Sequence, residues 1–210
     1  MDEVLVATGN PHKIDEIRAV LEPLGLRVLG LDACGSGFPE PDENGATFEA
    51  NARIKALAYA RMTGRTALAD DSGLEVDALG GAPGIFSARF AGVGTTRSER
   101  DAANNRLLLA RLRDVPSERR TARFVCAMCL AEPDGTILAE TRGAFDGVII
   151  DAPRGSNGFG YDPLLYLPER GCTSAELSPE EKNARSHRGH ATRLMADRLR
   201  TLGLVEPVAR

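Results

Sequence analysis

The stretch LADDSGLEVDALGGAPGIFSARF, residues 68–90, decides the fold and the chemistry that we expect of this chain. The apolar run at residues 66–69 is short enough to be a buried strand. Two adjacent carboxylates, Asp70 and Asp71, follow where we expect that strand to end. Acidic side chains at a strand end can hold a hard cation or deprotonate a water molecule, because the strand fixes them and the loop exposes them. An isolated pair of this kind more often only solvates a strand end, so its meaning depends on the rest of the chain.

The length and composition are those of a globular protein. The chain has 210 residues, of which 42% are hydrophobic and 27% are charged, so we expect one domain, residues 1–210, with two lobes. No apolar run approaches a membrane span, and the N-terminal sequence lacks the features of a secretory signal, so we expect a cytoplasmic protein. The net charge of −4 disfavours binding to nucleic acid. An anionic ligand would therefore need a local cluster of cations or a metal ion.

Two of the four cysteines, Cys126 and Cys129, have the C-x-x-C spacing of zinc and redox sites. They lie in a run that predicts a strand, where an offset of three places the two thiols on opposite faces. We therefore expect reduced thiols that pack in the core, as in a cytosolic protein.

The N-terminal segment predicts a strand at residues 3–7 and then a helix that begins within TGNPHK, residues 8–13. Asn10 is a favourable N-cap and Pro11 a favourable first helical residue. Free backbone N–H groups at the helix start, together with Lys13, could bind a phosphate. The same residues also fit an ordinary turn between a strand and a helix, and the spacing is not that of a Walker loop.

Residues 47–62 predict a second helix, which Gly64 ends. We expect its core stripe to consist of four apolar residues: Ala50, Ile54, Leu57 and Ala58. Asn51 and Lys55 lie four residues apart on another face. They could hold phosphate oxygens or form an ordinary surface pair.

The remaining segments predict a sheet with flanking helices. Further strands are expected at residues 26–31, 122–131, 136–141, 144–150 and 164–167. Helices are expected to begin near Ser98 and Ser178, and a last one to end near Leu202; the helix after Ser98 is assigned only a structural role. The order of elements predicts an α/β fold with a mixed twisted central sheet flanked by helices, in two lobes with the active cleft between them.

Two later segments carry candidate ligand groups. GSNGFGYDP, residues 155–163, is rich in glycine but lacks the spacing of a dinucleotide fingerprint. Its aromatic residues, Phe159 and Tyr161, could stack on a flat base, or they could be buried within a tight loop. KNARSHRG, residues 182–189, gathers basic and imidazole groups.

Six blocks in this order resemble the family of noncanonical purine nucleoside triphosphate pyrophosphatases, also called inosine triphosphate pyrophosphatases or dITP/XTP pyrophosphatases. The blocks are TGNPHK (8–13), TFEANARIKA (47–56), ADDSGL (69–74), GAPGIFSAR (81–89), GFGYDP (158–163) and SHRG (186–189). The resemblance implies hydrolysis of ITP, dITP and XTP between the α and β phosphates, which yields the nucleoside monophosphate and pyrophosphate and cleanses the nucleotide pool. It also implies magnesium as the cofactor and a homodimer as the usual assembly.

The resemblance implies a role for each site residue. Asp71 would be the proton acceptor and a magnesium ligand, with Asp70 in support, because a cation lowers the pKa of the water that it binds. The other metal ligand would lie in the acidic loop at residues 35–45, on Asp42, with Glu43 as the close alternative. The triphosphate would be held by Thr8, Gly9, Asn10, Pro11, His12, Lys13, Asn51, Lys55 and Ser72; the base and ribose by Phe159, Gly160, Tyr161 and Asp162; and the base edge by Lys182, His187 and Arg188.

One position departs from the family pattern. Ala50 stands where the family often has glutamate, and Glu49 precedes it, which moves the carboxylate about one hundred degrees around the helix.

Two alternative functions stay open at this point. One is a regulatory module that binds a nucleotide without turnover, and Asp71 argues against it because an extra buried negative charge does not help to bind a tetra-anion. The other is a broad phosphatase that releases orthophosphate.

Donors such as Lys182 and Arg188 fit a carbonyl at position 6 of a purine and would leave the amine of adenine unpaired. Guanine also has a 6-oxo group, so its exclusion must come from position 2.

Overall fold

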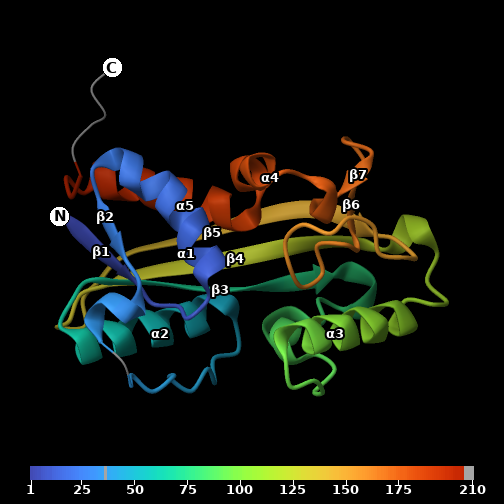
Figure 1. Cartoon of the computed structure of the whole chain (residues 1–210), viewed down its shortest axis with the longest axis horizontal. Coiled ribbons are helices and arrows are strands. Elements are labelled where there is room, and N and C mark those ends of the chain that lie inside the picture. Colours follow the sequence, from blue (N-terminus) through green and yellow to red (C-terminus); the bar gives the residue numbers. More distant parts are fainter. Residues whose placement is uncertain (36, 206–210) are drawn as a thin grey trace. The chain divides into compact units, whose positions relative to one another are not determined.

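A computed structural model describes residues 1–35 and 37–205 of the chain. The strands of this part form one seven-stranded sheet in the order β2-β1-β3-β4-β5-β6-β7 (Figure 1). The strands are β1 (Glu3–Val6), β2 (Arg27–Leu29), β3 (Ala67–Val76), β4 (Thr121–Ala131), β5 (Ile137–Ile149), β6 (Leu165–Leu167) and β7 (Cys172–Thr173). β1 pairs in parallel with β2 and β3, whereas β6 pairs antiparallel with β5 and β7. The sheet is therefore mixed, and the predicted α/β class is confirmed.

The helices are α1 (Pro11–Leu21), α2 (Phe48–Thr63), α3 (Arg97–Arg111), α4 (Pro179–Arg185) and α5 (His187–Thr201), with short 3-10 turns at Glu22–Leu24, Leu31–Cys34, Asp77–Leu79, Gly84–Arg89, Ser117–Arg119 and Ser174–Glu176. Helices α1 and α4 begin at the capping residues predicted for them, whereas α3 is capped by Thr96, two residues before the expected start at Ser98. Asn10 caps α1 by accepting the backbone N–H of His12, and Ser178 caps α4 by accepting that of Glu181. Among the residues described, no helix combines the length and the apolar character that crossing a bilayer requires.

The chain forms two compact units, each built from separate segments. The first unit consists of Met1–Asp71, Cys126–Gly143 and the chain from His187 onward. The second unit consists of Ser72–Val125 and Ala144–Ser186. The long strands β3, β4 and β5 contribute residues to both units. The two-lobed single domain remains a prediction.

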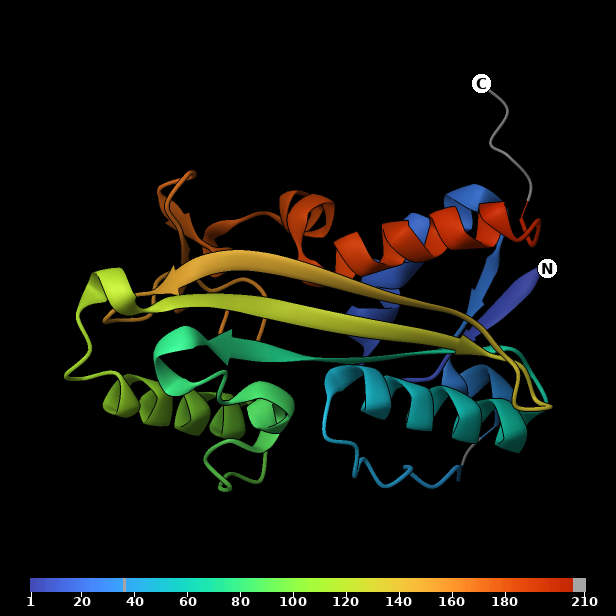
Figure 2. The same ribbon diagram turned by 180° about the vertical axis from the view of Figure 1, so that it is seen from behind.

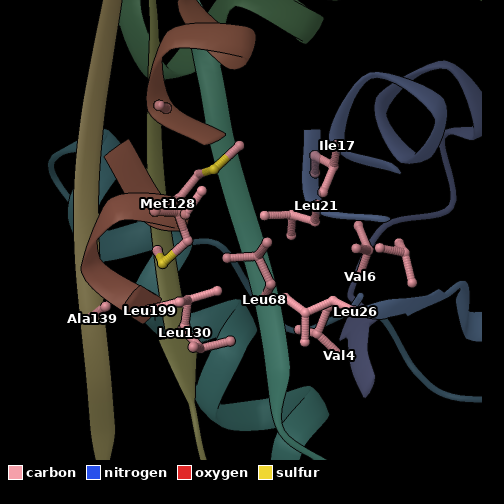
Figure 3. Packing of buried hydrophobic residues seen from close by; sticks show 14 of the residues in the cluster. Val4, Val6, Ile17, Leu21, Leu26, Leu68, Met128, Leu130, Ala139 and Leu199 are labelled. Atoms are coloured by element: carbon pink, nitrogen blue, oxygen red, sulfur yellow. The ribbon is translucent and has the colours of Figure 1, made fainter. Parts of the chain in front are cut away.

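In the first unit, α1 and α5 cover one face of the sheet and α2 covers the other (Figure 2). The core beneath α1 and α5 is aliphatic and includes Val4, Val6, Ile17, Leu21, Leu26, Leu68, Met128, Leu130, Ala139 and Leu199 (Figure 3). Leu68 lies two residues before Asp70 in β3. The carboxylates of β3 are therefore held by a well-packed part of the sheet.

Strand β3 does not end at the two aspartates, and this part of the prediction is wrong. β1 pairs with β3 only at residues 67 and 68, but β3 continues to Val76, so Asp70 and Asp71 lie in its middle. Within the second unit, the β3 edge is bonded by the turn that follows it: the N–H of Leu74 donates to Ser87 Oγ at 2.8 Å, and that of Val76 to the carbonyl of Ala82 at 3.2 Å. The glycine-rich turn at residues 80–84 supports the strand instead of ending it.

Strand β5 also runs further than predicted, as one strand in place of two. The expected break included Gly143, which lies inside β5. A Cβ atom on Gly143 would lie 2.2 Å from the carbonyl oxygen of His187. The glycine is there because α5 begins directly against the strand.

Helix α2 buries a different face from the one predicted. The buried residues are Phe48, Asn51, Ala52, Ala56, Tyr59 and Ala60. The four residues of the predicted stripe are only half-buried. Asn51 can lie on the inward face because its hydrogen-bond partners, Gly45 and Asp71, lie beneath the helix.

The second unit has its own apolar core. It includes Leu74, Val76, Leu108, Leu112, Phe124, Phe145, Ile149, Tyr161, Leu164 and Leu165. Helix α3 contributes Leu108, which is completely buried. This core fixes the end of the 155–163 loop, because Tyr161 and Leu164 belong to it.

Candidate active site

Asp70 is a buried carboxylate surrounded by donors of the first unit. Its side chain is 1% exposed, and Lys13 Nζ lies 3.1 Å from Oδ1 and 2.9 Å from Oδ2. Arg188 from α5 donates to Oδ2 through Nε at 3.3 Å and Nη2 at 3.2 Å, and Cys126 Sγ lies 3.8 Å from the same oxygen. Burial by itself would raise the pKa of Asp70, but the charges of Lys13, Arg188 and Lys55 hold that pKa well below its usual range. Asp70 is therefore a fixed anion.

Asp71 occupies the opposite environment, because successive side chains of a strand point to opposite faces. It accepts hydrogen bonds from Lys55 Nζ at 3.1 Å and Asn51 Nδ2 at 3.2 Å, both on α2. Burial raises the pKa of Asp71, and the negative charge of Glu43 adds to the increase, while Lys55 and Asn51 oppose it. A carboxylate with a raised pKa is a better proton acceptor than an ordinary one. The two neighbours therefore differ in what they can do chemically.

Asn51 joins the acidic loop to Asp71. It is completely buried, and its Oδ1 accepts the backbone N–H of Gly45 at 2.8 Å while its Nδ2 donates to Asp71. A Cβ atom on Gly45 would lie 2.7 Å from that Oδ1, so a larger residue would push the loop away. The loop end is thus held against the α2 face that carries Asn51 and Lys55.

The Asp71 side of the first unit also offers a site for a cation. Lys55 Nζ lies 3.1 Å from Asp71 and 3.2 Å from Glu43 Oε2, so two carboxylates converge on one positive group. Asp42 is exposed, and in the first unit its backbone carbonyl accepts the N–H of Asn44. Among the described residues no group of three or more His, Cys, Asp or Glu side chains converges. Two carboxylates nevertheless fit Mg²⁺, which usually takes one or two from the protein and the rest of its ligands from water and phosphate.

The TGNPHK turn forms the capped start of α1. Thr8 Oγ1 accepts the N–H of Asn10 at 3.2 Å, and Asn10 Oδ1 accepts that of His12 at 3.2 Å. Thr8, Gly9 and Pro11 line a cavity of about 360 Å³ beside α1. The structure thus groups residues 8–13 around one helix start, with Lys13 tied to Asp70.

Asp162 organises the glycine-rich loop of the second unit. It is buried and accepts hydrogen bonds from the N–H of Phe159 at 2.8 Å, Ser174 Oγ at 2.8 Å and Lys182 Nζ at 2.5 Å. A Cβ atom on Gly158, whose φ is +76°, would lie 2.2 Å from Asp162 Oδ2. Lys182 Nζ lies 5.0 Å from the centre of the Phe159 ring. The aromatic ring and the lysine are therefore positioned by one carboxylate.

Tyr161 and Phe159 differ in their surroundings. Tyr161 is buried, and its hydroxyl donates to the carbonyl of Ser87 at 2.9 Å. Burial raises the pKa of this hydroxyl. Phe159 is half-buried, so of the two rings it is the better placed to meet a ligand.

Helix α3 supports this loop, and the structural role predicted for it remains a prediction. Asp101 Oδ2 accepts the N–H of Gly160 at 3.0 Å, and Asn105 Nδ2 donates to the carbonyl of Gly160 at 3.0 Å. The guanidinium of Arg97 lies 4.3 Å from the centre of the Phe159 ring. These residues are spaced four apart, on one face of the helix, and that polar spacing was the signal in the sequence.

The basic block at residues 182–189 belongs to both units. Lys182 is part of the second unit and binds Asp162, whereas His187 and Arg188 begin α5 in the first unit. Arg188 is 1% exposed and donates to Asp70 and, at 2.7 Å, to Glu16 Oε2. Glu16 was not among the predicted site residues, although it lies three residues after Lys13 on α1. Ser72 follows Asp71 in β3 and belongs to the second unit.

Three further residues of the first unit stand out in the sequence: Glu49, Cys126 and Cys129. Glu49, which precedes Ala50, accepts a hydrogen bond from Arg142 of β5 at 2.8 Å. Its carboxylate is thus part of a surface ion pair. Cys126 and Cys129 are completely buried, as expected of thiols that pack in the core, and burial raises the pKa of both, that of Cys129 to about 12.

The whole chain is similar to known proteins. The model of the Ham1 family matches residues 4–198. A dITP/XTP pyrophosphatase of Exiguobacterium sibiricum is 49% identical over 95% of this chain and 98% of its own length, and one of Geobacter sulfurreducens is 48% identical over 97% and 100%. A solved HAM1 protein of Coxiella burnetii superposes with a TM-score of 0.85 at 39% identity, covering 96% of this chain and 100% of its own. This chain is therefore a member of the Ham1 family.

Proposed function

We propose that this protein hydrolyses noncanonical purine nucleoside triphosphates, namely ITP, dITP and XTP, to the nucleoside monophosphate and pyrophosphate, and so cleanses the nucleotide pool. The observation that carries the proposal is the contrast between two adjacent aspartates. Asp70 is held ionised by Lys13 and Arg188, and Asp71 has a raised pKa beside Lys55 and Asn51. The names of the relatives, dITP/XTP pyrophosphatases, support the class of substrate.

In the proposed reaction Asp71 accepts the proton of the attacking water. Asn51 Nδ2 and Lys55 Nζ fix the direction of its carboxylate for this role. Asp70 holds Lys13 through an ion pair, so that the ammonium stays beside the start of α1. Lys13 and Lys55 then provide positive charge for the triphosphate, together with the N–H groups of the α1 start.

We propose Mg²⁺ as the cofactor, with Asp71 and Glu43 as its protein ligands and Asp42 as the less suitable candidate. The support is that Lys55 already sits between the carboxylates of Asp71 and Glu43. When bound, the ion would neutralise phosphate charge and lower the pKa of a coordinated water molecule. Lys55, with its pKa raised by Asp71, Asp70 and Glu43 against the effect of burial, stays charged and available for phosphate oxygens.

The remaining predicted residues keep their proposed roles. Triphosphate binding is assigned to Thr8, Gly9, Asn10, Pro11, His12, Lys13, Asn51, Lys55 and Ser72, and the base and ribose to Phe159, Gly160, Tyr161, Asp162, Lys182, His187 and Arg188. A cytoplasmic location is supported by four free cysteines, two of them fully buried, which suit a reducing compartment. The homodimer rests on the family resemblance.

One assay decides between this proposal and its two alternatives. Purified protein is incubated with dITP and magnesium, and the products are identified by chromatography. Inosine-type monophosphate together with pyrophosphate is the expected result. Orthophosphate as the product would indicate a broad phosphatase, and nucleotide binding without turnover would indicate a regulatory module.

A further inference from the structure

Arg97 is an exposed cation on the aromatic ring that we propose to meet the base. Its guanidinium lies 4.3 Å from the centre of the Phe159 ring, and its side chain is 42% exposed. Its ion pair with Asp101, also on α3, is long, at 3.9 Å. Arg97 is thus close to the loop without being buried in it.

The two cations near the Phe159 ring, Lys182 and Arg97, differ in burial and in the length of their ion pairs. Lys182, the other cation near Phe159, is buried in a direct pair with Asp162 at 2.5 Å, so these two charges largely cancel. Asp101 accepts the N–H of Gly160 and so also serves to fix the loop. Arg97 therefore supplies the positive charge nearest to solvent on this ring.

The helix dipole does not explain a cation at this position. Arg97 is the first residue of α3, directly after the N-cap Thr96. The positive end of the helix dipole disfavours a cation there. A role outside the helix is therefore expected, and the structure places the guanidinium of Arg97 over the Phe159 ring.

We infer that Arg97 determines specificity by favouring xanthine over hypoxanthine nucleotides; this inference rests on the proposed function. A base that stacks on Phe159 either lies beside the guanidinium or takes its place on the ring, and in both cases it meets the charge of Arg97. Xanthine has a second carbonyl at position 2, and in its nucleotides the base loses a ring proton close to neutral pH. Hypoxanthine lacks that carbonyl and stays neutral. A guanidinium attracts the anionic base and can donate to its carbonyl.

The test compares Arg97→Gln with the wild-type protein on XTP and ITP. We expect kcat/KM for XTP to fall about three- to tenfold and kcat/KM for ITP to change less than about twofold, from the usual strength of an exposed cation against a ring. Arg97→Lys keeps the charge and should retain most of the preference. Arg106→Gln, an exposed arginine of the same helix, is the matched control and should change neither substrate.

An unchanged ratio of kcat/KM for XTP to that for ITP in Arg97→Gln, with or without an equal loss for both substrates, would overturn the inference. The pH dependence gives a second readout. The wild-type ratio should rise from mildly acidic to mildly alkaline pH as xanthine ionises, and Arg97→Gln should flatten that rise; an equal rise in both proteins would exclude the charge of Arg97 as its cause. Asp101 pairs with Arg97 on α3, and Lys182 and Asp162 contact Phe159; all three residues are common to both proteins.

Binding of the monophosphates separates this inference from the proposed function. Calorimetry with XMP and IMP requires no turnover, and Arg97→Gln should weaken XMP binding by about the same three- to tenfold factor while IMP binding is kept. A wild-type protein that binds XMP more tightly than IMP but hydrolyses no triphosphate would refute the proposed function alone. Equal effects on XMP and IMP would refute the role of Arg97 alone.

Discussion

Replacing Asp70 with asparagine should destabilise the protein far more than the same replacement at its neighbour Asp71. The Asp70 carboxylate is 1% exposed and lies within 3.3 Å of nitrogens of Lys13 and Arg188. An asparagine leaves these cations without their shared anion, and removing one partner of a buried ion pair costs about 3–5 kcal/mol. Arg188 keeps Glu16 at 2.7 Å, so we expect the lower end, about 3 kcal/mol.

Asp71→Asn leaves no cation without an anionic partner, unlike Asp70→Asn. Lys55 keeps Glu43 at 3.2 Å, and the new amide can still accept a hydrogen bond, so the expected cost is about 0–1 kcal/mol. The directions of the two pKa shifts agree with this expected difference in stability. The lowered pKa of Asp70 contributes stability that is present above its unfolded pKa and is lost as the pH falls through the folded pKa. The raised pKa of Asp71 has the opposite sign, because its ionised form is disfavoured in the folded state above the unfolded pKa.

Urea and thermal unfolding at neutral pH, followed by circular dichroism, measure the difference between the two variants. We expect Asp70→Asn to lie about 2 kcal/mol or more below Asp71→Asn in free energy of unfolding, or about 4–8 °C in thermal midpoint. With dITP and magnesium, Asp71→Asn should release no pyrophosphate while nucleotide binding survives. Equal destabilisation by the two variants would refute the reasoning that the aspartates face opposite environments, and an active Asp71→Asn would refute its role as proton acceptor.

Three further perturbations test other parts of the structure. Glu43→Gln should raise the magnesium concentration needed for half-maximal activity about tenfold or more, whereas Asp42→Asn, the matched control, should not; equal shifts would refute our choice of ligand. Glu99→Gln should lower the thermal midpoint at neutral pH, because the pKa of Glu99 in the folded protein, about 2, lies below the ordinary value of about 4.3. The difference from wild type should vanish as the pH falls from about 4 to about 2. A difference that stays constant over this range would contradict the prediction. Gly143→Ala should destabilise by about 1–3 kcal/mol in urea unfolding, because its Cβ would lie 2.2 Å from the carbonyl of His187; a neutral effect would show that α5 can shift.

The difference in pKa between the adjacent Asp70 and Asp71 has a simple physical origin. Adjacent residues of a strand face opposite sides, so one carboxylate meets the cations of α1 and α5 and the other meets α2. Because the strand is buried on both sides, water screens neither carboxylate effectively. Each pKa is then set by the partners on its own side, and one pair of identical residues acquires two chemical characters.

Much of the local structure could be predicted from the sequence, because its causes lie within a few residues. Asn10 and Ser178 cap the helices that they were expected to cap, and Gly64 ends α2 with a φ of +67°. The α/β class followed from the order of elements, and the family from six short blocks in a given order. In these cases the side chain acts on its own backbone or on the next turn, and no distant partner is needed.

The sequence by itself therefore determined the α/β class, the family and the starts of α1 and α4, and it predicted which groups are reactive. Only the tertiary structure decided that β3 runs on past Asp71, since the bonds that continue it come from the turn around residues 82–87. It also decided that α2 buries Asn51, and that α3 carries Arg97 to Phe159. These outcomes depend on partners that are distant in the chain, and such partners can override the local preference for apolar residues inside and polar residues outside.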